Sequence, residues 1–106
     1  MMAIVEKSNC IIKILTLLKD RYYNHLLDIY LLIYNSYDLN VDSYNEIIKL
    51  LESNGYTSID YDSVSLVQFD DFKTDFDKFR NEIENHPMKI TINGKKFLKK
   101  LISEKK

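Results

Sequence analysis

The chain of 106 residues contains one cysteine, one proline, two glycines and no tryptophan. A lone cysteine, Cys10, excludes an internal disulfide and a cysteine-rich zinc site. Two glycines are too few for a glycine-rich phosphate-binding loop, and one proline excludes a proline-rich linker. The 15 basic and 16 acidic residues give a net charge of −1, so no overall basic field indicates a nucleic-acid partner.

Long hydrophobic runs are also missing. The longest apolar stretch, residues 26–34, is interrupted by Asp28 and is far shorter than the ~20 residues that a membrane helix needs. The first residues lack the basic leader and the small-residue cleavage site of a secretory signal. We therefore expect a cytoplasmic protein that has no membrane partner.

The composition indicates one globular domain over residues 1–106. Hydrophobic residues make up 45% of the chain and charged residues 29%, which is too apolar for a disordered protein. A chain of this length has room for a single core.

Signals for catalysis or metal binding are weak. His25 and His86 have no Cys or His close by in the sequence, so a zinc site of standard spacing is not expected. Cys10 falls on an apolar helix face, where a thiol usually serves packing. The aspartates of residues 60–77 lack the central glycine of a calcium loop and indicate a solvated acidic surface. We expect no enzymatic activity, no metal and no cofactor.

Apolar spacing predicts two helices before residue 36. The first covers residues 8–19 and is capped by Ser8. The second covers residues 22–35 and is apolar nearly all round, so it is either central in the fold or shared with a partner. We expect a homodimer because this helix offers more apolar surface than one small core needs; the alternative is that other helices of the chain cover it. The predicted interface uses four tyrosines: Tyr23, Tyr30, Tyr34 and Tyr37.

The third predicted helix, residues 44–54, has signals at both ends. Ser43 and Glu46 fit a capping box, and Gly55 supplies a left-handed C-terminal stop. Its predicted buried face consists of Tyr44, Ile47, Ile48 and Leu51.

The second half of the chain changes in character. Alternation predicts strands at residues 56–61 and 64–69, and a short strand at 88–92. Between them, residues 71–85 have the spacing of an acidic helix with phenylalanines along one edge. The last helix is predicted from residue 94 to 104, capped by Thr91 or Asn93.

Two short motifs in this arrangement resemble the winged helix-turn-helix superfamily of small bacterial and phage proteins. The segment Leu51-Glu52-Ser53-Asn54-Gly55-Tyr56 is similar to the step that ends a recognition helix in that superfamily. Residues 91–98 are similar to the step that follows the last wing strand. The resemblance covers nearly the whole chain. It implies a helix-dominated α+β domain with a small antiparallel sheet, here with the acidic helix as an insertion.

The resemblance also implies a DNA-binding transcriptional regulator, of phage or mobile-element origin, that reads DNA with its third helix. Ser43, Asn45 and Lys49 would then face the DNA. Asn45 can read adenine and Lys49 can reach guanine or phosphate, whereas Glu46 and Glu52 would repel the phosphate backbone. A merely solvated helix face is the alternative.

Charge is divided unevenly along the chain. Residues 86–106 contain seven basic residues and one acidic residue, whereas residues 60–85 contain three and eight. The basic segment favours a phosphate-contacting patch, with a solvated face as the alternative; its lysines are Lys89, Lys95, Lys96, Lys99 and Lys100. DNA-binding wings normally carry Arg or Lys where this chain is acidic. A second hypothesis is therefore a protein-interaction module that has lost DNA binding and docks a partner on the acidic helix.

Overall fold

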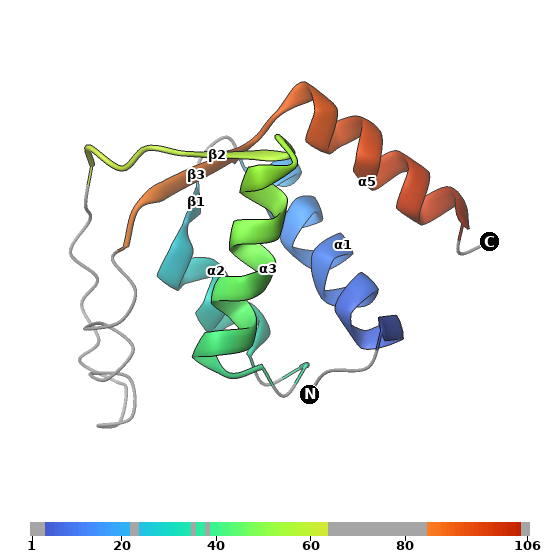
Figure 1. Ribbon diagram of the computed structural model, residues 1–106, viewed down its shortest axis with the longest axis horizontal. Helices are drawn as coiled ribbons and strands as arrows, with labels where there is room; N and C mark the ends of the chain where they lie inside the picture. Colours follow the sequence, from blue (N-terminus) through green and yellow to red (C-terminus); the bar gives the residue numbers. More distant parts are fainter. Residues whose placement is uncertain (1–3, 22–23, 35, 38, 64–84, 105–106) are drawn as a thin grey trace.

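The computed structural model describes residues 4–21, 24–34, 36–37, 39–63 and 85–104. Four helices and three short strands follow one another in this part of the chain (Figure 1). In chain order they are α1 (Ile4–Asp20), β1 (Asn24–His25), α2 (Leu26–Ile33), α3 (Val41–Ser53), β2 (Thr57–Ile59), β3 (Pro87–Ile90) and α5 (Ile92–Glu104). The predicted helix-dominated α+β class is confirmed.

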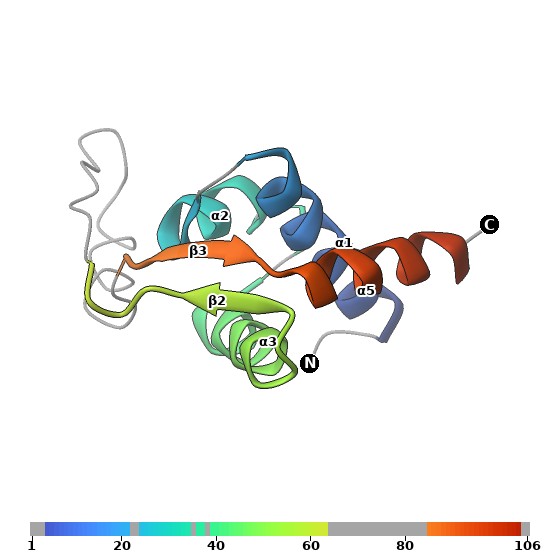
Figure 2. The same ribbon diagram turned by 90° about the horizontal axis from the view of Figure 1, so that it is seen from above.

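The three strands form one antiparallel sheet in the order β1-β3-β2. The central strand β3 pairs Met88 with Asn24 of β1 and with Ile59 of β2. Seen from above, α3 lies beside β2, and α1 and α2 lie on the other side of the strands (Figure 2). Helix α5 continues from the end of β3 and extends away from the sheet (Figures 1 and 2).

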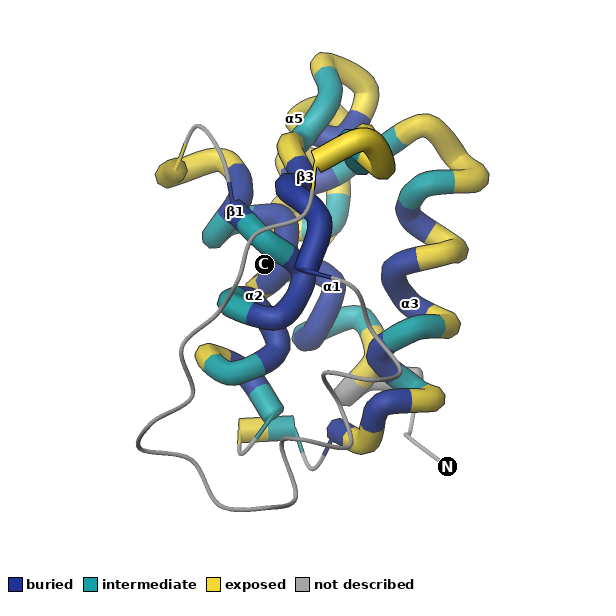
Figure 3. Tube along the Cα trace, turned by 90° about the vertical axis from the view of Figure 1, so that its left-hand side faces the viewer, coloured by how far each residue is buried: buried dark blue, intermediate teal, exposed yellow. Residues whose placement is uncertain are grey.

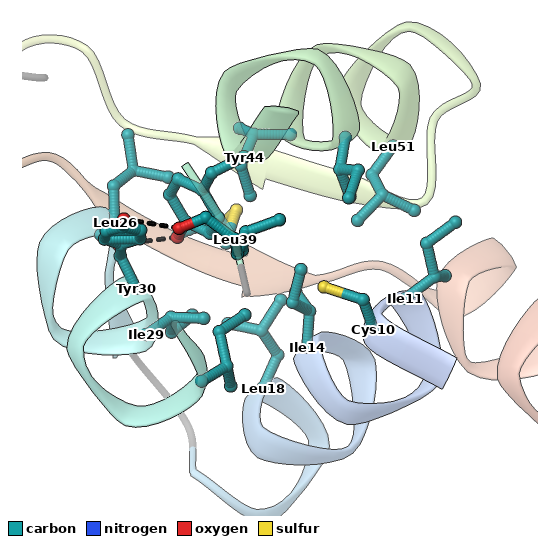
Figure 4. Close-up of a cluster of buried hydrophobic side chains, with 14 of the residues drawn as sticks. Cys10, Ile11, Ile14, Leu18, Leu26, Ile29, Tyr30, Leu39, Tyr44 and Leu51 are labelled. Atoms are coloured by element: carbon teal, nitrogen blue, oxygen red, sulfur yellow. Dashed lines mark hydrogen bonds between the residues drawn. The ribbon is translucent and has the colours of Figure 1, made fainter. Parts of the chain in front are cut away.

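The core lies between the inner faces of α1, α2 and α3, with Met88 of the sheet buried against them (Figures 3 and 4). On α3 the four residues predicted from periodicity, Tyr44, Ile47, Ile48 and Leu51, are all buried. On α1 the buried side chains are Cys10, Ile11, Ile14, Leu15 and Leu18. Burial of such side chains is the main favourable term in folding, at about 1.5–3 kcal/mol for each large aliphatic one.

Two buried tyrosines connect this core to the backbone (Figure 4). The Tyr44 hydroxyl donates a hydrogen bond to the Leu26 carbonyl oxygen over 2.5 Å, and the Tyr30 hydroxyl donates to the Leu39 carbonyl oxygen over 2.6 Å. Their rings lie 5.0 Å apart at 49°. The first bond joins α3 to the start of α2, and the second joins α2 to the residues that lead into α3.

Several predicted helix ends are wrong. Helix α1 begins at Ile4, so Ser8 lies inside it rather than at its N-cap. Helix α3 begins at Val41, and its N-cap is Asn40, whose Oδ1 accepts a hydrogen bond of 2.8 Å from the Ser43 backbone N–H. Asn40 is therefore the cap, and the residue predicted for that role, Ser43, donates its backbone N–H to it.

The start of the second helix was also predicted wrongly. Strand β1 takes residues 24–25, and α2 begins only at Leu26. The predicted strand at 88–92 and the last helix are confirmed with shifted ends, as β3 and α5. Of the two predicted caps of α5, Thr91 is the one used, because its Oγ1 accepts a hydrogen bond from the Gly94 N–H. The strand predicted at 64–69 and residues 71–84 of the acidic helix lie outside the described residues; Asn85 is not helical.

Because ionisable groups are buried in this core, the free energy of unfolding depends on pH in the alkaline range. Burial raises the pKa of the Cys10 thiol from 9.0 to about 11. Burial, with a smaller contribution from Tyr34, raises the pKa of Tyr30 from 10.0 to about 12. The pKa of Tyr44 is raised well above 10.0, mainly by burial.

We expect the free energy of unfolding to fall as the pH rises above about 9. The folded chain holds these protons more tightly than the unfolded chain, so each contribution is complete below the ordinary pKa and is lost as pH rises through the raised one. Urea denaturation at a series of pH values measures this. A denaturation midpoint that stays constant through about pH 11 would contradict the burial of these groups.

Candidate nucleic-acid interface

The lysines predicted to contact phosphate all lie on the surface of β3 and α5. Each of Lys89, Lys95, Lys96, Lys99 and Lys100 is exposed. Within the described ranges the one ion pair joins His25 to Asp28, at 3.5 Å, so none of these lysines is neutralised by a described carboxylate. Helix α5 therefore presents a basic surface that is open to an anionic partner.

The start of α5 is fixed against the turn that ends α3. The Thr91 backbone N–H donates to the Tyr56 carbonyl oxygen over 3.0 Å, and the Thr91 hydroxyl donates to the Gly55 carbonyl oxygen over 2.6 Å. The same hydroxyl oxygen accepts the Gly94 N–H over 2.9 Å. Gly55 has a φ of 74°, the left-handed conformation that glycine adopts most readily.

Gly94 allows this close approach. A Cβ at this position would lie 2.0 Å from the Tyr56 carbonyl oxygen and 2.7 Å from Cγ1 of Ile90. One turn further along α5, the ring of Phe97 stacks on that of Tyr56, with centroids 4.1 Å apart and planes 8° apart. We refer to this set of contacts, Gly55, Tyr56, Thr91, Gly94 and Phe97, as the α3–α5 junction.

Two hollows flank α5. The first, of about 320 Å³, opens at the junction and is lined by Asn54, Tyr56, Asn93, Lys96, Phe97 and Lys100. The second, of about 500 Å³, lies toward α1 and is lined by Lys19, Lys95, Leu98, Lys99, Ile102 and Ser103. The lysines of α5 are thus divided between two faces.

Sequence reasoning missed three residues that line these hollows: Asn54, Asn93 and Lys19. Helical spacing places Asn93 with Lys96 and Lys100, so it could have been found. The contribution of Lys19 depends on how α1 crosses α5, which the sequence does not show.

The predicted base-reading residues have a different environment. Ser43 and Asn45 are half-buried on α3, and Lys49 is exposed. Helix α3 carries Lys49 as its one basic residue and three acidic residues, Asp42, Glu46 and Glu52. This helix therefore contributes net negative charge, which repels a phosphate backbone.

The structure does not bring Ser43 and Asn45 together with the lysines of α5. Ser43 lies in the first turn of α3, and Asn54 lies at its C-cap, eleven residues later. At 1.5 Å per residue, that separation is about 16 Å along the helix axis. Because α5 begins beside the C-terminal end of α3 (Figure 1), Ser43 and Asn45 are at the end of the helix that is remote from Lys96 and Lys100.

Contacts at the outer end of the β2–β3 pair tie that region to α3. The Tyr61 hydroxyl lies 2.6 and 2.8 Å from the two carboxylate oxygens of Glu52. This hydrogen bond, helped by burial and by the Glu52 charge, raises the pKa of Tyr61 from 10.0 to about 12. The His86 Nδ1 lies 2.7 Å from the Ser63 carbonyl oxygen, and its ring meets Tyr61 edge-on at 5.2 Å.

The tyrosines predicted for a dimer interface are not one exposed surface. Tyr30 is only 2% exposed and belongs to the core, so its assignment to an interface is wrong. Tyr34 and Tyr37 are half-buried, and Tyr23 lies outside the described residues. Helix α2 buries most of its apolar residues within the chain, although Leu32 is 50% exposed. The homodimer stays a prediction.

Neither a metal cluster nor a membrane span occurs in the described part of the chain. No three His, Cys, Asp or Glu side chains among its residues are grouped to hold a metal ion. None of its helices is both long and apolar enough to cross a membrane. Comparison with protein-family models, curated proteins and solved structures finds no match to this chain.

Proposed function

We propose that this protein is a DNA-binding regulator of the winged-helix type that contacts DNA mainly through α5 and β3. The observation that carries this proposal is the set of five exposed lysines on these two elements, none of them paired with a described carboxylate. Support from the fold is the order of three helices followed by the antiparallel β2–β3 pair, with β1 added at the edge of β3, in agreement with the winged-helix resemblance.

The energy of such binding comes from phosphate neutralisation. Each lysine that contacts a phosphate releases condensed counterions, with a slope of about −0.9 in log K against log salt for each contact. Separate phosphate contacts from all five lysines would give a slope of about −4.5, which is the upper limit. Affinity should therefore be measurable at low salt and fall steeply as salt rises.

The acidic residues of α3 decide which surface faces the DNA. Asp42, Glu46 and Glu52 outnumber Lys49, so an approach centred on this helix costs repulsion that an approach centred on α5 avoids. In this proposal Asn45 and Lys49 make at most peripheral contacts. The docking then differs from that of a winged-helix protein that reads the major groove with its third helix.

Reversing two charges on α5 should weaken DNA binding by more than ten-fold. We expect this for the double variant Lys95→Glu, Lys96→Glu with any mixed-sequence duplex, because phosphate contacts carry no sequence information. Fluorescence anisotropy at about 50 and 200 mM salt measures both the affinity and the salt slope. The matched control is Lys7→Glu, Lys13→Glu, which makes the same charge change at two exposed positions of α1.

Two results would contradict the proposal. One is a wild-type protein with no detectable duplex binding at about 50 mM salt. The other is an equal loss of affinity for the α5 pair and the α1 pair, which would indicate that only net charge matters.

A protein-interaction module is the second candidate, and the surface of α3 favours it. Leu50 is 41% exposed on the same helix as Glu46, Lys49 and Glu52. Protein interfaces place apolar side chains at their centre and polar ones around them. Loss of partner binding in a Leu50→Ser variant that keeps the wild-type affinity for DNA would favour this candidate.

A further inference from the structure

The shallow hollow at the α3–α5 junction is lined by donors suited to an anion. Four residues of its lining share one face of α5, because each lies three or four positions from two of the others: Asn93, Lys96, Phe97 and Lys100. The facing wall is the turn after α3, with Asn54 and Tyr56. Two ammonium groups and two carboxamides therefore line a space of about 320 Å³ that no described acidic side chain enters.

The walls of this hollow are held in place. The ring stack of Tyr56 and Phe97 and the hydrogen bonds of Thr91 fix α5 against the turn. The Asn54 Nδ2 donates to the Leu50 carbonyl oxygen over 2.7 Å, which orients its carboxamide. Binding of an anion then orders the exposed side chains of Lys96, Lys100 and Asn93, of which the two lysines lose the most rotamer freedom.

The aromatic pair also affects the electrostatics. Tyr56 and Phe97 are half-buried and give an apolar lining to the hollow that Lys96 and Lys100 also line. Attraction between a lysine and an anion is stronger beside low-dielectric material than in open water. The start of α5 adds the partial positive charge of a helix N-terminus.

We propose that this hollow binds one phosphate group of the DNA backbone and thereby fixes the position of α5 on the duplex. The inference rests on the proposed function and makes it more specific: one phosphate is held by Lys96 and Lys100 with the Asn93 amide, while the other lysines act by long-range attraction. The ligand chemistry is a phosphate oxyanion, which a nucleic-acid backbone or free phosphate can supply.

The hollow on the opposite face of α5 provides the comparison. It has three lysines, Lys19, Lys95 and Lys99, but its other lining residues are Leu98, Ile102 and Ser103. It therefore lacks the carboxamide donors and the stacked aromatic pair that line the first hollow. The two faces of one helix carry equal numbers of its lysines, so they can be tested against each other at constant charge.

The decisive experiment compares Lys96→Ala, Lys100→Ala with Lys95→Ala, Lys99→Ala. Both variants lose two positive charges from exposed positions of α5. We expect the first pair to lose at least ten-fold in duplex affinity at about 100 mM salt and to reduce the salt slope by about 0.9, from the one lost phosphate contact. We expect the second pair to lose less than about three-fold, since only long-range attraction is removed. Equal losses would overturn the inference and leave the proposed function standing.

A neutral substitution separates a built site from general electrostatics. Asn93→Ala changes no charge and should lower duplex affinity by about two- to ten-fold, the value of one hydrogen bond, with an unchanged salt slope. A wild-type affinity in this variant would remove the amide from the site and overturn that part of the inference.

Titration with inorganic phosphate keeps the inference testable if the protein does not bind DNA. Side-chain amide signals of Asn54 and Asn93 in the NMR spectrum should shift and saturate with phosphate in the wild type, and should not shift in Lys96→Ala, Lys100→Ala. Without duplex binding, a saturating shift means that the site takes free phosphate and that the proposed function is wrong. Without duplex binding and without such a shift, both proposals are wrong.

Discussion

Replacement of Tyr44 by alanine should lower the free energy of unfolding by about 4 kcal/mol. Tyr44 has no exposed surface, and its ring lies 5.0 Å from that of Tyr30 in the centre of the core (Figure 4). The substitution leaves a cavity of aromatic size between α3 and α2. It also removes the donor that satisfies the Leu26 carbonyl oxygen. Urea denaturation followed by far-UV circular dichroism measures the change.

Tyr44→Phe divides this effect into packing and hydrogen bonding. The ring remains, so the loss should be about 1–3 kcal/mol, the cost of leaving a buried carbonyl oxygen without its donor. Tyr61→Phe is the matched control, because Tyr61 is 59% exposed and its hydroxyl bonds an exposed carboxylate. That control should change stability by less than about 1 kcal/mol. If Tyr44→Ala costs no more than Tyr61→Phe, the position assigned to Tyr44 is wrong.

The third helix shows what sequence periodicity can predict. Its buried residues recur at spacings of three and four, and its C-terminal glycine marks the stop, so both the buried face and the end at Gly55 were predictable. The predicted start was a few residues late, because two polar residues, Asn40 and Ser43, were both suitable caps. Local rules cannot decide between two caps that lie within one turn of each other.

The start of α2 was not predictable because its partners are distant in sequence. The Leu26 N–H donates to the His86 carbonyl oxygen over 3.0 Å, and the Leu27 N–H donates to Oδ1 of Asn85 over 3.0 Å. A residue 58 positions away thus serves as the helix cap. Strand β1 has only two residues and exists through its pairing with β3. Apolar spacing alone therefore predicted a helix that starts at residue 22 and includes the two residues of β1.

The candidate site was predictable in composition and not in arrangement. The spacing of lysines on α5 indicates a basic helix, and all of them are exposed. Whether these lysines join the third helix in one surface depends on where α5 leaves the sheet. The α3–α5 junction sets that position through contacts between residues about 40 positions apart, such as Tyr56 with Phe97. Those contacts leave the lysines near the C-terminal end of α3.

Gly94→Ala should therefore destabilise the protein, although alanine is the better helix former. In an ordinary exposed helix this substitution gains about 0.5–1 kcal/mol. Here the added Cβ would lie 2.0 Å from the Tyr56 carbonyl oxygen, which is backbone that already accepts the Thr91 N–H. Relief of the clash requires α5 to move away from the turn. We expect a loss of about 3 kcal/mol, and a melting temperature lower by about 10–20 °C.

Gly55→Ala separates this steric effect from the general cost of replacing a glycine. Gly55 has a positive φ, but a Cβ added there would have no other atom within 4 Å, so alanine should cost only the left-handed strain of about 1–2 kcal/mol, and Gly55→Asn should cost less. The two positions also differ in their effect on binding. Below its melting temperature, Gly94→Ala should weaken duplex binding because the hollow at the junction opens, whereas Gly55→Ala should not. A Gly94→Ala variant that melts at or above the wild-type temperature would show that α5 is not packed against Tyr56. The proposed phosphate site would then lack the contacts that hold its walls in place.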